Sequence, residues 1–184
     1  MVIRTACLMA LLGVVTAASA GTFQLESQNA VFGGSVAPSV SGYFSNRRNV
    51  STFFLVGEQY AEGYISFSRS TTFGDAFVAA DVGLGVEQTP AGFGRMIAAS
   101  VFAKQGNTSF LGVVERGSGL WYKCHFKWQI VSQVSVGILA QRYAGIGPRI
   151  DVRIPRTPLT VWGAALRDKE FGRSGGIVAA TSSF

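Results

Sequence analysis

The sequence feature that most constrains the fold is an alternation of apolar and polar residues over positions 120–154. Even positions are mostly apolar and odd positions are mostly charged or polar, with Trp121 as an exception. This is the pattern of β-strands, because successive side chains of a strand point to opposite faces. The predicted sheet has one apolar face and one charged face, and the charged face carries Lys123, His125, Lys127, Arg149, Asp151 and Arg153.

Such a sheet fits two kinds of protein. In a water-soluble barrel or sandwich the apolar face lies inside, whereas in an outer-membrane barrel the apolar face meets lipid and the charged face lines the lumen. The mean hydropathy of +0.30 with 14% charged residues is high for a soluble secreted domain. No apolar run after the first residues approaches the roughly 18 residues of a membrane-spanning helix. Hydrophobicity spread over alternating strands therefore favours the membrane barrel.

The N-terminal segment has the pattern of an export signal. Arg4 supplies a positive charge, residues 8–15 are apolar, and Ala18, Ser19 and Ala20 form a small-residue cleavage site. We expect a cleaved signal peptide over 1–20 and a single β-barrel domain over 21–184, of which 21–51 is poorly patterned. Export also argues against a nucleic-acid partner, in spite of a net charge of +6.

Short apolar-rich segments separated by turn residues follow one another from Thr52 to the end of the chain. The segment from Val40 to Phe44 is a further candidate strand. We predict an all-β fold, an antiparallel up-and-down β-barrel of eight strands, or ten. The predicted strands are 52–59, 62–69, 75–86, 93–104, 108–116, 119–130, 133–142, 147–154, 158–167 and 175–184.

The chain ends in Phe184. In its export signal, length, strand rhythm and closing aromatic residue it resembles the small outer-membrane β-barrel proteins of Gram-negative bacteria. The resemblance implies a place in the bacterial outer membrane, insertion by the barrel-assembly machinery through the strand that ends at Phe184, and contact with outer-membrane lipid or lipopolysaccharide. The final strand departs from the family, because the positions that share the parity of Phe184 are Gly176, Val178, Ala180 and Ser182.

His125 is the only histidine, so a catalytic or metal-binding role would have to use it. No serine lies two residues from His125, and a histidine and Cys124 on opposite faces of a strand do not converge on one ion. The sequence therefore predicts no enzyme, no metal site and no cofactor. Pairing of this strand with the next places His125 opposite Leu139. If the following hairpin pairs Gln141 with Arg149, Asp151 lies two strand spacings from His125.

We predict a structural or surface-interaction protein whose lumen is filled by a polar network of the six charged-face residues, which is structural or binds a ligand or ion. Counter-charges are expected from Glu58, Glu62, Asp81, Glu87 and Glu115. One alternative is a soluble, lipocalin-like barrel, periplasmic or secreted, that binds an apolar ligand inside. The other is an outer-membrane lipid-modifying enzyme. The pattern leaves open which way Trp162 faces, and the membrane prediction requires outward side chains at Tyr122, Phe126, Val136 and Val152.

Overall fold

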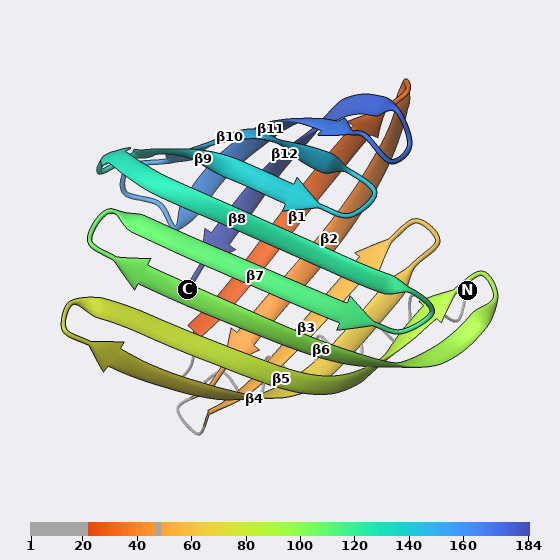
Figure 1. Cartoon of the computed structure of the whole chain (residues 1–184), viewed down its shortest axis with the longest axis horizontal. Helices are drawn as coiled ribbons and strands as arrows, with labels where there is room; N and C mark the ends of the chain where they lie inside the picture. The colour runs from red at the N-terminus through yellow and green to blue at the C-terminus, as the bar shows by residue number, and fades with distance from the viewer. Residues whose placement is uncertain (1–21, 47–48) are drawn as a thin grey trace.

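The protein is a closed antiparallel barrel of twelve strands (Figure 1). The computed structural model describes residues 22–46 and 49–184. Each strand pairs with its neighbours in sequence, and β1 pairs with β12 to close the barrel. The predicted signal peptide, 1–20, lies outside the described residues. The strands are β1 (Thr22–Phe32), β2 (Ser35–Ser45), β3 (Val50–Gly57), β4 (Ala61–Phe73), β5 (Ala76–Thr89), β6 (Gly92–Gln105), β7 (Thr108–Arg116), β8 (Leu120–Val131), β9 (Val134–Gln141), β10 (Gly145–Arg153), β11 (Leu159–Asp168) and β12 (Arg173–Ser183).

The predicted fold class is confirmed, but the predicted number of eight or ten strands is wrong. The ten segments predicted from Thr52 onward correspond to β3–β12. The two additional strands, β1 and β2, lie in the segment that looked poorly patterned, and β2 includes the candidate strand at Val40–Phe44. Polar or small residues at the outward positions Ser27, Asn29, Pro38 and Gly42 interrupt the apolar outward residues of these two strands, which weakens the alternation typical of a lipid-facing strand.

The apolar face of the barrel points outward. Leu84 is 72% exposed and Phe126 is 48% exposed, whereas the side chain of Lys123 on the inner face is only 17% exposed. An apolar outer surface around a closed barrel is the arrangement that satisfies backbone groups in lipid. It does not favour the soluble alternative, which requires the same residues to pack inside. In the described part of the chain, no helix is long and apolar enough to cross a membrane.

The barrel has two ends, and the connections at both are short. We call the end with the β1–β2, β3–β4, β5–β6, β7–β8, β9–β10 and β11–β12 connections the loop end, and the opposite end the terminal end. At the terminal end Phe23 N donates to Phe184 O at 3.0 Å, and Phe184 N donates to Phe23 O at 2.8 Å. Their rings are stacked with centroids 6.3 Å apart. The two chain ends are therefore held together beside the closing β1–β12 pair.

An apolar cluster fills part of the lumen along β9, β11 and β12. Leu139, Trp162, Leu166 and Ile177 are each at most 3% exposed, and Phe32 of β1 packs against them. Full burial of such side chains contributes about 1.5–3 kcal/mol each. The sequence predicted a charged inner face and did not anticipate this cluster. The position of Trp162 in this cluster shows that its side chain points into the lumen, which the sequence pattern had left open.

Candidate functional site

Four of the six predicted lumen residues, His125, Lys127, Arg149 and Asp151, form one network on the inner faces of β8 and β10, and Lys123 shares the Trp162 ring with Arg149. Arg149 donates two hydrogen bonds to Asp151, from Nε to Oδ2 at 2.8 Å and from Nη2 to Oδ1 at 2.7 Å. Lys127 Nζ lies 3.5 Å from the same Oδ1. Arg149 and Asp151 are both buried, and their hydrogen-bonded ion pair compensates for the hydration that each charge loses on burial. Arg153, the sixth residue, is exposed at the end of β10, and it forms no ion pair within the described ranges.

His125 contacts Arg149, which connects it to Asp151. Its Nδ1 lies 3.1 Å from Arg149 Nη1. A guanidinium group only donates hydrogen bonds, so Nδ1 accepts and the imidazole is neutral. The predicted pairs of His125 with Leu139 and of Lys123 with Gln141 are confirmed.

The predicted pairing of Gln141 with Arg149 is wrong, since Gln141 pairs with Gly145. The turn lies earlier than the gap between the predicted strands 133–142 and 147–154 implies, because β10 already begins at Gly145. A Cβ atom at Gly147 would lie 1.8 Å from Ala165 O, so only glycine permits the close approach of β10 and β11. As a result Arg149, which pairs with Gly137, reaches His125, and Asp151 pairs with Ser135.

The counter-charge of Lys123 is Glu26, which sequence reasoning missed. Lys123 Nζ lies 3.5 Å from Glu26 Oε1. The other carboxylate oxygen accepts hydrogen bonds from Trp162 Nε1 at 3.0 Å and from Thr181 Oγ1 at 2.9 Å. Glu26 lies on β1 and Lys123 on β8, which are five steps apart around the barrel. The ion pair therefore crosses the lumen.

This contact requires a flattened barrel. A circular barrel of twelve strands, about 4.8 Å apart and tilted by about 40°, has a diameter of about 24 Å. Extended Glu and Lys side chains in contact span only about 14 Å between their Cα atoms. The walls that carry Glu26 and Lys123 must therefore lie closer together than in a circular barrel. In Figure 1 these walls are β1 and β2 behind β7 and β8.

A second cluster, on the inner face near the loop end, is acidic. Glu62, Glu87 and Glu115 are buried at 9%, 4% and 4% exposure. The Tyr60 hydroxyl lies 2.5 Å from Glu62 Oε2 and 3.1 Å from Glu87 Oε2, and Ser118 N donates to Glu87 Oε1. Burial and the hydrogen bonds to Glu62 and Glu87 raise the pKa of the Tyr60 hydroxyl, which remains a donor.

The acidic residues expected to neutralise the lumen cations do not do so. Within residues 22–46 and 49–184, none of the five predicted counter-charges forms an ion pair. Asp81, for example, accepts hydrogen bonds from Ser68 and from Ser100 Oγ, the latter at 2.9 Å. Ser68 in turn shares a 2.7 Å hydrogen bond with Ser51. Hydroxyl groups therefore satisfy this carboxylate in place of lysines.

Among residues 22–46 and 49–184, no catalytic pair is recognisable in the lumen. The one side-chain hydrogen bond of His125 in the described part of the chain is to Arg149, so no serine or cysteine is positioned for activation by it. Cys124 is a free thiol on the opposite face of β8. Within the described ranges no three His, Cys, Asp or Glu side chains converge as metal ligands.

Comparison with known proteins shows similarity of fold. No protein-family model matches the sequence, and no curated protein has a significantly similar sequence. A KdgM porin solved in complex with disordered oligogalacturonate superposes with a TM-score of 0.63 and 7% identity, over 88% of this chain and 99% of the porin. Outer membrane phospholipase A from Escherichia coli gives a TM-score of 0.56 and 9% identity, over 89% and 90% of the two chains. Omp33 of Acinetobacter baumannii gives 0.51 and 8%, over 89% and 98%.

The solved structures include porins as well as an enzyme, so the likeness alone does not assign an activity. It agrees with the outward apolar surface and supports the predicted location in a bacterial outer membrane. The chain has the fold of the outer-membrane β-barrel proteins.

Proposed function

We propose that this protein is a structural β-barrel of the bacterial outer membrane with a side-chain-filled lumen, and that it does not act as a wide pore. The observation that carries the proposal is the ion pair of Glu26 and Lys123, which crosses the lumen. The apolar cluster fills the space on the β9–β12 side of this pair. On the other side, inward residues of β3, β4 and β6 are also buried, with Ser51, Ser66 and Met96 at most 4% exposed.

A structural role accounts better for the connections than a surface-interaction role does. The longest connection in the barrel, between β10 and β11, spans only 154–158. Outer-membrane barrels in general have extracellular loops that are longer than their periplasmic turns. Such short connections offer little area beyond the membrane for a macromolecular partner.

We further propose that the barrel-assembly machinery inserts the chain through its C-terminal strand. Phe184 shares the outward parity of Val178 on β12, and its side chain is 69% exposed. Its backbone pairs with Phe23 only when the barrel closes. The residue is therefore accessible before closure and becomes part of the closing seam afterwards.

The second candidate function is a narrow channel for small charged solutes. It is favoured by partial exposure of inward side chains toward the terminal end, where Phe77 is 39% exposed and the Lys127 side chain is 28% exposed. In this alternative the pair of Glu26 and Lys123 is the constriction that limits passage.

Conductance in planar bilayers separates the two functions. For the structural barrel we expect wild-type protein to produce no stable conductance steps, and we expect steps to appear in Glu26→Ala/Lys123→Ala because the crossing pair is gone. Small regular steps from the wild type would favour the narrow channel. Wide porin-like steps, unchanged in the double variant, would contradict both proposals.

A further inference from the structure

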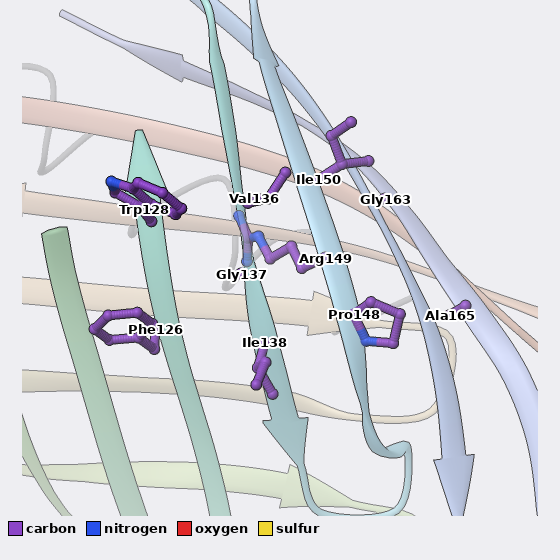
Figure 2. A pocket seen from close by; sticks show the side chains of 10 residues that line it. All are labelled: Phe126, Trp128, Val136, Gly137, Ile138, Pro148, Arg149, Ile150, Gly163 and Ala165. Carbon is purple, nitrogen blue, oxygen red and sulfur yellow. The ribbon is translucent and has the colours of Figure 1, made fainter. Parts of the chain in front are cut away.

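The membrane-facing surface of the barrel has an apolar groove across β8–β11 (Figure 2). One side is high, because it is formed by the rings of Phe126 and Trp128 on β8. The opposite side is low, since Gly163 and Ala165 on β11 have little or no side chain. Its volume of about 590 Å³ lies within the range of about 300–1,000 Å³ found for small-molecule ligand sites.

The groove must be covered by hydrocarbon. Ile138 and Ile150, which lie between its two sides, are 53% and 50% exposed, and Trp128 is 54% exposed. These side chains point away from the lumen into the region of the lipid acyl chains. A flexible acyl chain that lies in the groove contacts both of its sides, whereas an acyl chain on the flatter surface elsewhere contacts the protein on one side only.

A cationic residue lies at the loop end of the groove. Arg167 comes two positions after Ala165 on β11 and so lies on the same outward face, paired with Ile146. It is exposed, and within residues 22–46 and 49–184 it forms no ion pair and no side-chain hydrogen bond. Arg142 lies at the same end, in the β9–β10 connection, and donates to Leu120 O. A guanidinium group beside hydrocarbon is stabilised when it binds an anion.

The loop end lies in the outer leaflet if the predicted export is correct. An exported chain enters the outer membrane from the periplasm, and an even number of strands keeps both chain ends on that side. Arg95 and Arg116 are further exposed outward arginines near this end, so cationic side chains surround much of the barrel there. Lys169 and Glu170 in the neighbouring β11–β12 connection cancel in charge.

We propose that the groove and Arg167 bind an acylated, phosphorylated glycolipid of the outer leaflet, the lipid anchor of lipopolysaccharide. One acyl chain lies in the groove, and a phosphate group accepts hydrogen bonds from the Arg167 guanidinium. Phosphate is the head group best matched to arginine, because its oxygens accept two parallel N–H bonds. Arg142 adds a second positive charge at the same end.

The test is native mass spectrometry of the full chain in detergent micelles, titrated with purified diphosphorylated lipid A. We expect one lipid A molecule to remain bound to each barrel, and Arg167→Ala to weaken binding about tenfold, the size expected for one charge-assisted hydrogen bond. Gly163→Leu should weaken binding similarly by filling the groove. A Cβ atom there meets only Ile177 O, at 3.7 Å, so the barrel itself has room for it.

The matched control is Arg95→Ala, which removes an exposed outward arginine away from the groove and should leave binding unchanged. Removal of both phosphates from lipid A should weaken binding to wild type and abolish the difference between wild type and Arg167→Ala. Equal effects of Arg95→Ala and Arg167→Ala would overturn the proposal, as would binding that Gly163→Leu leaves unchanged. Heat-modifiable migration on gels checks folding, and if Arg167→Ala fails that check, Arg167→Lys replaces it and should bind more weakly than wild type.

Discussion

Glu26 on β1 and Lys123 on β8 approach to 3.5 Å across the lumen, although their strands are five steps apart around the barrel. The carboxylate is also held by Trp162 and Thr181 on the β11 and β12 wall. One acidic residue therefore links the neighbouring strands β1, β12 and β11 to β8 across the lumen. The contact is made only when the whole barrel has formed, which makes it a sensitive probe of the folded state.

Removal of one partner of this pair should destabilise the barrel more than removal of both. Lys123→Met leaves a largely buried carboxylate without its cation, and we expect a loss of about 3 kcal/mol in the free energy of unfolding. Glu26→Gln/Lys123→Met leaves no unpaired charge and should lose less. Urea unfolding in micelles, followed by tryptophan fluorescence, measures both variants. Strict additivity of the single substitutions would show that the two side chains do not interact.

Trp162→Phe tests the hydrogen bonds that the indole N–H donates inside the lumen, to Glu26 Oε2 at 3.0 Å and to Thr181 Oγ1 at 3.3 Å. A phenylalanine ring keeps an aromatic face beside Arg149, whose guanidinium carbon lies 3.8 Å from the Trp162 ring centroid. It loses the indole N–H that donates to Glu26. A hydrogen bond to a charged acceptor contributes about 1.5–3 kcal/mol, so we expect a loss of that order in the free energy of unfolding. A difference below about 0.5 kcal/mol would mean that Thr181 and Lys123 satisfy Glu26 without the indole.

Substitution by alanine should impair folding at one of two glycines in neighbouring strands and be tolerated at the other. In Gly147→Ala the added methyl group would lie 1.8 Å from Ala165 O, so β10 and β11 cannot keep their spacing. In Gly163→Ala the nearest atom is 3.7 Å away. We expect Gly147→Ala to lose most of the heat-modifiable folded form after refolding and Gly163→Ala to retain it. Similar yields for both would contradict the close approach of β10 and β11.

The sequence predicted the orientation of β8–β10 well, because long polar side chains alternate there with large apolar ones. The inward placement of Lys123, Lys127 and Arg149 follows from parity alone. Parity does not determine the turn, however. The predicted position of Asp151 was wrong because the turn was expected between the predicted strands 133–142 and 147–154, whereas β10 already begins at Gly145, and Gly145 and Gly147 permit its close approach to β11.

Strands β1 and β2 were not predicted in full because the signal depends on the contrast between the two faces. Ser27 and Asn29 interrupt the outward face of β1, and Glu26 points inward, so the contrast between the two faces of β1 is weak. The partner of Lys123 was therefore hidden in a segment with no apparent pattern. The apolar inner cluster was missed for a related reason. Leu139 lies at a position where parity predicts the lumen, which was expected to be polar, and the facing of Trp162 was left open.

Phe184→Ala should impair assembly in cells more than folding in vitro. The residue contributes its ring to the Phe23 stack and its backbone to the seam, and the substitution retains the backbone hydrogen bonds. Refolding of the purified variant into micelles should therefore remain close to wild type. If the assembly machinery reads the aromatic residue, as we propose, the amount of heat-modifiable barrel in outer-membrane fractions should fall several-fold. The control is Val178→Ala, which truncates another outward side chain of β12 that is 58% exposed. Equal losses for both variants in cells would show that truncation of the lipid-facing surface, and not loss of the terminal aromatic ring, limits assembly.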